Sequence, residues 1–310
     1  MNASTENDKG LLLTGLDGSN PLAFLAALGA LRTLARVWPK RDVRLGWQCK
    51  SGCWRPTIAT SPPPDAASVV EAMQPELSRA AQFKAFRFAA DLKLPPNKFT
   101  SFIRLASVQW HDGSDPRCAE FAGAFACEAL TNKDGTIQDT AFRTMSGAGH
   151  QHFLAFMAEL ARVTNGEHLR TALFKPWRYD EQKLSMRWDP SDDRRYALRW
   201  NDPSEDVIRT VRGANRLAIE ALPLFPVAPV GGNLQTTGFG SLGGRGVFWT
   251  WPIWEAFLPL DTVRSILALA GLQRKRPDRL NLAACGIVEI FRCERITVGK
   301  FRNFTPPHTV

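Results

Sequence analysis

One segment near the N-terminus is apolar on nearly every side and limits the fold more than any other part of the chain. It reads LAFLAALGALRTLARVW, residues 22–38, with Arg32 and Arg36 one helical turn apart. Asn20 can cap this helix, and Pro21 suits its first turn. A helix that is hydrophobic all round is buried, so other elements of the chain must cover it.

Patterns typical of strands and of helices follow one another along the rest of the chain. Residues 11–16, 43–49 and 54–60 are typical of short strands. The proline-rich loop 61–65 ends in Asp65, which can cap the next helix. Helical patterns dominate from there to about residue 175. The first half therefore predicts a few strands followed by a helix-rich middle.

The second half predicts a hairpin, a basic helix and further strands. The hairpin arms are residues 184–188 and 194–200, and the second arm alternates apolar residues with arginines. Asp202 and Pro203 are typical of a helix start, and the helical pattern continues to about residue 222. Strands at 247–251 and 286–299 flank a helix at 260–272.

These patterns predict an α+β fold with mixed helices, short antiparallel sheets and a glycine-rich loop in the C-terminal third. We expect a disordered tail over residues 1–10, an N-terminal part over 11–130 and a C-terminal part over 131–310. One continuous domain is the alternative division. No stretch approaches the roughly 20 apolar residues of a membrane span, and the polar N-terminus lacks a signal-peptide pattern, so we expect a cytoplasmic protein.

Glycines crowd into the segment TTGFGSLGGRGVFWTWPIW, residues 236–254. Gly238, Gly240 and Gly243 match the dinucleotide fingerprint G-x-G-x-x-G, but a strand pattern follows where that fingerprint needs a helix. Such a run can also form an anion-binding nest of backbone N–H groups. We therefore predict a phosphate site made by Gly238, Gly240, Gly243, Gly244 and Arg245.

The two tryptophans that follow these glycines have two possible roles. Trp249 or Trp251 could stack a nucleic-acid base. The alternative is that the glycines form a turn between strands and that both indole rings lie in the core. The sequence leaves both readings open.

Arginines gather in the same half of the chain, and the net charge of +9 favours a polyanionic partner. Several of these arginines share one face of the predicted helix or lie on the hairpin before it, which predicts a basic patch. Contacts from such a patch to phosphates would make binding depend on salt. The alternative is an ordinary solvated surface. The predicted patch consists of Arg187, Arg195 and Arg199 on the hairpin and Arg209, Arg212 and Arg216 on the helix.

Cysteines and histidines give no strong signal for a metal or a catalytic site. Cys49 and Cys53 resemble half of a zinc clip, but no second pair of suitable spacing follows. Cys118 and Cys127 are predicted to share one face of a helix as reduced thiols. His150 and His152 could act as acid–base groups in RNA cleavage, or as capping or surface residues. We predict no cofactor and no metal.

Four segments resemble proteins encoded in type I-G (formerly type I-U) CRISPR loci. They are LTGLDGSNPLAFLAALGALRTLA, RWDPSDDRRYALRWNDPS, RLAIEALPLFPV and the glycine–aromatic stretch that begins at Thr236. The resembling family is an accessory or small interference protein, sometimes described as an extension of the CRISPR helicase–nuclease. The first helix and the glycine stretch are also similar to the large effector subunit.

The resemblance implies an RNA-binding role, because subunits of CRISPR complexes commonly hold the guide backbone with a glycine-rich loop. Here residues 238–246 would be that loop. Helicase motifs are missing from the sequence, so any cleavage would belong to a partner. The expected function is a non-catalytic subunit that binds guide RNA, target DNA or both beside other type I-G proteins. The alternatives are an adaptor that recruits the helicase–nuclease and a small RNA endonuclease.

Overall fold

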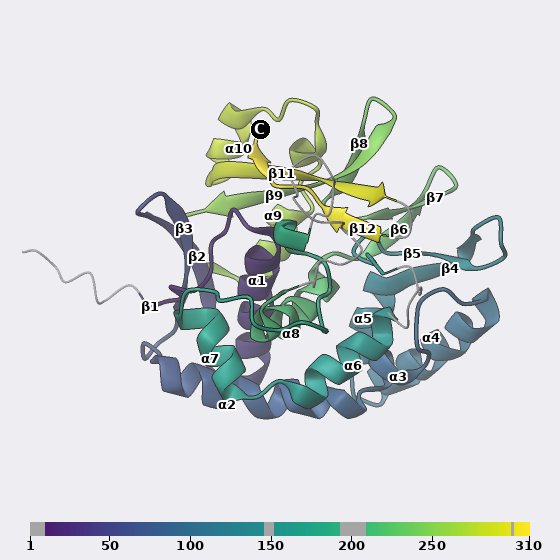
Figure 1. Cartoon of the computed structure of the whole chain (residues 1–310), viewed down its shortest axis with the longest axis horizontal. Coiled ribbons are helices and arrows are strands. Elements are labelled where there is room, and N and C mark those ends of the chain that lie inside the picture. The colour runs from purple at the N-terminus through teal and green to yellow at the C-terminus, as the bar shows by residue number, and fades with distance from the viewer. Residues whose placement is uncertain (1–9, 146–151, 193–208, 299–300) are drawn as a thin grey trace, which may run out of the picture.

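Helix α1, Pro21–Val37, lies at the centre of the molecule and begins where the sequence predicts. The computed structural model describes residues 10–145, 152–192, 209–298 and 301–310 (Figure 1). The Asn20 side chain accepts a hydrogen bond from the Ala23 N–H at 3.1 Å and caps the helix. Every residue of the helix from its first position to Leu34 is buried, as predicted for an all-round apolar helix.

The predicted α+β class is confirmed, and helices dominate the middle of the chain. Asp65 accepts from the Ser68 N–H and forms the expected cap of α2. The other helices are α2 (Ala66–Arg79), α3 (Lys84–Arg87), α4 (Pro96–His111), α5 (Arg117–Phe125), α6 (Phe153–Val163), α7 (Gly166–Phe174), α8 (Arg212–Ala221), α9 (Leu260–Leu267) and α10 (Arg279–Ala284).

The strands pair antiparallel in two main sheets. One has the order β1-β3-β2-β10, and the other has the order β12-β11-β9-β8, with β13 also paired to β11. Two separate hairpins, β4–β5 and β6–β7, complete the set. The strands are β1 (Leu11–Leu12), β2 (Arg44–Lys50), β3 (Cys53–Ala59), β4 (Ala126–Thr131), β5 (Ile137–Asp139), β6 (Val227–Val230), β7 (Asn233–Thr236), β8 (Phe239–Leu242), β9 (Arg245–Trp254), β10 (Leu258–Pro259), β11 (Ile287–Val298), β12 (Phe301–Phe304) and β13 (His308–Thr309).

The central helix lies between two layers. Figure 1 shows α2, α6 and α7 along one side, the sheet of β8, β9 and β11 on the other, and α1 with α8 between them. Helices α1 and α8 cross closely at Gly29, where a Cβ atom would lie only 1.8 Å from the carbonyl oxygen of Leu217. Only glycine allows this approach, so a single residue type sets the spacing of the two central helices.

Tryptophans from distant parts of the chain form the centre of the core. Trp47, Trp249, Trp251 and Trp254 are fully buried around Phe24, with ring centroids 5.5–6.4 Å from it. Trp251 donates its indole N–H to Gly18 O at 2.9 Å. The prediction that Trp249 or Trp251 stacks a base is therefore wrong, and the core-packing alternative is confirmed, because neither ring reaches the surface.

Three predicted elements differ in the structure. Residues 184–188 form no strand, and the second hairpin arm, 194–200, lies outside the described residues. The helix expected from Asp202 appears as α8, which starts at Arg212. Residues 209–211 before it are extended, and Thr210 pairs with Glu181 in an isolated bridge. Cys127 lies in β4 rather than on the helix that holds Cys118.

Within the described part of the chain, every helix falls short of the length and hydrophobicity that a membrane crossing needs.

Candidate nucleic-acid interface

The glycine-rich run forms a β-hairpin rather than an irregular loop. Leu242 of β8 pairs with Arg245 of β9, so Gly243 and Gly244 make a two-residue turn. Their φ angles are +63° and +76°, and a type I′ hairpin turn needs positive φ at both central positions. A Cβ atom at either glycine would meet nothing within 4 Å. Backbone conformation, not crowding, therefore explains these two glycines. This agrees with the alternative that the glycines form a turn between strands.

The other two predicted glycines have different surroundings. Gly238 has a φ of +81° and lies against the indole ring of Trp249, 3.1 Å from the position of an added Cβ. Gly240 lies in β8 and faces a pocket beside the hairpin. The backbone of Arg245 begins β9, but its side chain lies outside the described part of the structure. Phosphate binding by these residues stays a prediction.

The predicted basic patch is not one exposed surface. Arg216 is fully buried, pairs with Glu220 at 2.8 Å and donates to the carbonyl oxygen of Leu77. Arg187 is only 2% exposed. The expectation that these two arginines reach a ligand at the surface is therefore wrong, because neither guanidinium is accessible.

The remaining members of that patch are Arg209 and Arg212, which the structure describes, and Arg195 and Arg199, which it does not. Arg212 is half-buried and pairs with Glu181 at 2.5 Å. Arg209 is exposed and stays a candidate contact. Arg195 and Arg199 lie outside the described residues. Of the described members, Arg209 is thus exposed and Arg212 is partly exposed but held by a carboxylate.

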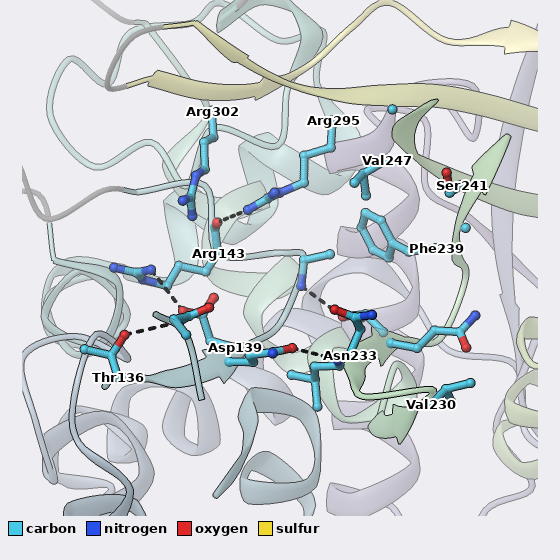
Figure 2. Close-up of a pocket in the computed structure, with 18 of the residues that line it drawn as sticks. Thr136, Asp139, Arg143, Val230, Asn233, Phe239, Ser241, Val247, Arg295 and Arg302 are labelled. Atoms are coloured by element: carbon cyan, nitrogen blue, oxygen red, sulfur yellow. Dashed lines mark hydrogen bonds and ion pairs between the residues drawn. The ribbon is translucent and has the colours of Figure 1, made fainter. Parts of the chain in front are cut away.

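A pocket of about 800 Å³ lies beside the glycine hairpin, between the hairpins β4–β5 and β6–β7 and the sheet of β8, β9, β11 and β12 (Figure 2). Its volume is typical of a small-molecule site. Three arginines line it, namely Arg143, Arg295 and Arg302. We call these the arginine cluster. None of the three was singled out from the sequence.

Arg143 is the member of the arginine cluster whose side chain is held by carboxylates. Its Nε donates to Asp91 Oδ1 at 2.6 Å, and its Nη1 donates to Asp139 Oδ2 at 3.0 Å. Its carbonyl oxygen accepts a hydrogen bond from Arg295 at 2.8 Å. The side chain is 5% exposed, and its Nη2 has no hydrogen-bond partner among the described residues. One donor of a buried guanidinium is thus left unsatisfied.

Arg295 and Arg302 reach the pocket from neighbouring strands. In the β11–β12 ladder Arg295 is opposite Phe304 and Arg302 is opposite Thr297, which places both arginines diagonally on one face. Figure 2 shows both side chains pointing toward Arg143. Within the described residues, no carboxylate forms an ion pair with Arg302 or Arg295.

The electrostatics of the cluster reflect this crowding of like charges. Burial and the neighbouring Arg302 lower the pKa of Arg295 to about 10, which leaves it charged at neutral pH. Burial raises the pKa of Asp139, although the nearby arginines oppose this. The two carboxylates, those of Asp91 and Asp139, both pair with Arg143, and Arg295 and Arg302 have no carboxylate of their own among the described residues. The pocket carries surplus positive charge and suits an anion.

Of the two candidate acid–base histidines, the structure describes only His152. His152 precedes α6, and its Nδ1 lies 3.6 Å from Asp91 Oδ2. His150 lies outside the described residues. No cluster of three metal-ligating side chains occurs in the described ranges. The described histidine therefore lies beside a carboxylate that also holds Arg143, and it has no second catalytic group beside it among the described residues.

The arginine cluster could be found only in part from the sequence. The strand pattern at 286–299 predicts β11, and a tight turn after it would place Arg295 and Arg302 on one face. Arg143 is more than 150 residues away along the chain from both, and only the tertiary fold brings it there. The chain matches no protein-family model, no curated protein and no solved structure.

Proposed function

We propose that the protein is a non-catalytic, nucleic-acid-binding subunit of a type I-G CRISPR interference complex. The observation that carries the binding role is the arginine cluster, with its surplus charge at an open pocket beside the glycine hairpin. The segments quoted from the sequence support the type I-G assignment. The proposal places the protein in the cytoplasm, where its free cysteines stay reduced.

Arginine suits this role because its planar guanidinium matches phosphate geometry with paired donors. Arg302 has no carboxylate partner among the described residues, so it can bind a phosphate without first giving up an ion pair. Arg209 is exposed and stays a predicted nucleic-acid contact. Guide RNA, target DNA or both would be the ligand, and base pairing with the guide would provide sequence recognition.

The proposal predicts that binding depends on Arg302 and on salt. Fluorescence anisotropy would follow single-stranded RNA, single-stranded DNA and duplex DNA across a salt series. We expect Arg302→Gln to weaken binding about tenfold and to reduce the salt slope by about one, because one phosphate contact is lost. Arg104→Gln is the matched control, since Arg104 is exposed on α4 away from the pocket.

Two outcomes would contradict the proposal. One is that the unmutated protein, alone and with its complex partners, shows no salt-sensitive binding to any of the three ligands. The other is that both variants weaken binding equally, since overall charge and not the arginine cluster would then account for it. A loss of binding in Arg302→Gln that Arg104→Gln does not show supports the proposal. The nucleic acid that binds most tightly then identifies the ligand as RNA, single-stranded DNA or duplex DNA.

An adaptor role is the second candidate, and exposed apolar residues on α4 favour it. Val108 is 59% exposed, Trp110 is 54% exposed and Leu105 is 37% exposed. Large apolar side chains at this exposure are typical of protein contacts when they gather. Capture of the helicase–nuclease from nuclease-treated extract, lost in Trp110→Ser but kept in Arg302→Gln, would favour this role.

A further inference from the structure

We infer that the pocket receives one unpaired nucleotide, with its phosphate on the arginine cluster and its base against strand β7. The inference rests on the proposed function, since it names the unit of the strand that this site holds. A groove that only follows a backbone needs cations along an open surface. This site is instead a pocket of about 800 Å³ with cations at one side and amides at another.

The phosphate end of the pocket is defined by unsatisfied donors. Arg143 Nη2 and Arg295 Nε are both buried without a hydrogen-bond partner among the described residues. Buried donors of this kind are costly when they stay unpaired. The guanidinium of Arg302 lies beside them in the pocket wall and has no carboxylate partner in the described ranges. A phosphate at this end of the pocket would lie against the three arginine side chains that line it.

Two acidic residues orient the arginine side chains at the phosphate end of the pocket. Asp91 and Asp139 hold Arg143 from behind through bonds of 2.6 and 3.0 Å. The Arg143 carbonyl oxygen in turn holds one nitrogen of Arg295. The guanidinium groups are thus oriented before a ligand arrives, which reduces the entropy lost on binding.

The base end is formed by β7 and β8. Asn233 and Gln235 are two residues apart on β7, so their side chains share one face, and both are exposed in the pocket lining. An amide group carries a donor and an acceptor that match the edge of a base. Phe239 and Val247 add apolar wall beside them. In the view of Figure 2, Asn233 and Phe239 lie across the pocket from Arg143.

The charge of the site fits a nucleotide better than a neutral ligand. Three guanidinium groups face two carboxylates, which leaves one positive charge for the phosphate. The remaining acid at the rim, Asp134, is paired with Lys93 at 3.2 Å. A nucleoside without phosphate would leave the arginine cluster unpaired, so the phosphate should supply a large part of the affinity.

Isothermal titration calorimetry on the full chain tests the inference with four nucleoside 5′-monophosphates, the matching nucleosides and inorganic phosphate. We expect at least one nucleotide to bind about tenfold more tightly than its nucleoside and than phosphate. Gln235→Trp should weaken nucleotide binding about tenfold or more, because the indole fills the pocket while the arginines remain. Ala129→Trp, at an exposed position on β4 outside the pocket lining, is the matched control.

The same variants are then titrated with single-stranded RNA and with a duplex of the same sequence. Nucleotide binding that Gln235→Trp removes supports the inference, and competition by the free nucleotide against the single strand shows that both use one site. Nucleotide binding without strand binding supports the pocket and overturns the proposed function. Strand binding that survives Gln235→Trp without nucleotide binding overturns the inference alone. Phosphate binding as tight as every nucleotide also overturns it.

Discussion

Burial divides the arginines of this protein into groups with different roles. Arg216 is fully enclosed and serves the helix packing through its pair with Glu220. Arg302 faces a pocket and has no carboxylate partner within the described residues. Sequence spacing predicted that Arg216 belongs to a binding surface and gave no signal for Arg302. Helical spacing reports which residues share a face, whereas accessibility depends on what packs against that face.

Glu220 is the centre of the buried charge network, and its removal should destabilise the fold strongly. Burial alone would raise its pKa, but the surrounding guanidinium groups, above all that of Arg216, lower the pKa of Glu220 to about 2. Glu220→Gln leaves Arg216 buried without a carboxylate partner, whereas Arg32 and Arg36 keep Glu120 and Glu76. We expect the free energy of unfolding to fall by about 3–5 kcal/mol, measured by urea denaturation at neutral pH.

The pH dependence of the same variant gives an independent check. A carboxylate whose pKa is lowered by folding stabilises the protein above its ordinary pKa of 4.5, and this stabilisation is lost as the pH falls from there toward 2. The unmutated protein should lose stability across that window more steeply than Glu220→Gln. Glu167→Gln, which breaks an exposed pair with Lys175, should cost far less stability than Glu220→Gln, because water and salt screen an exposed pair. Equal losses in both variants would contradict a central role for Glu220.

At the level of elements, the crossing of α1 and α8 depends on one glycine. An added Cβ at Gly29 would lie 1.8 Å from the Leu217 carbonyl oxygen, and backbone cannot rotate away as a side chain can. We expect Gly29→Ala to lower the free energy of unfolding by about 3 kcal/mol or more, because the two helices must separate. Thermal melts followed by circular dichroism would measure it.

Gly123 in α5 provides the matched control for this prediction. It is exposed, and an added Cβ there would meet nothing within 4 Å. Gly123→Ala should raise stability by about 0.5–1 kcal/mol, because alanine favours the helix. If both alanine variants changed stability in the same direction, close packing of α1 on α8 would not be the reason for glycine at position 29.

Elements with strong local signals were predicted well from the sequence. The caps at Asn20 and Asp65 mark the starts of α1 and α2 correctly, because capping involves only neighbouring residues. The helix start predicted at Asp202 and Pro203 lies outside the described residues, and the described helix α8 starts at Arg212. Residues 209–211 are extended instead, because Thr210 pairs with Glu181 from a distant segment. Tertiary contacts of this kind leave no trace in local spacing.

The pocket illustrates the same limit for function. The glycines predicted a special backbone, and they do form a tight turn beside the site. The arginine side chains that give the pocket its charge come from the segment after β5 and from strands β11 and β12. No motif of fixed spacing joins residues so far apart, so composition could indicate a polyanionic partner but could not locate its site.

On the scale of the whole molecule, the buried tryptophans join segments from both ends of the chain. Trp47 lies on β2, whereas Trp249, Trp251 and Trp254 lie on β9, and all four surround Phe24 of α1. Strand β10 also pairs with β2. We therefore expect one cooperative unfolding transition, with tryptophan fluorescence and far-ultraviolet circular dichroism changing together. Fluorescence reports on this shared core, and circular dichroism reports on the helices around it. If fluorescence changed at a lower denaturant concentration than circular dichroism, the sheet of β9 and β11 would unfold independently of the helices, and the core would not hold the two halves together.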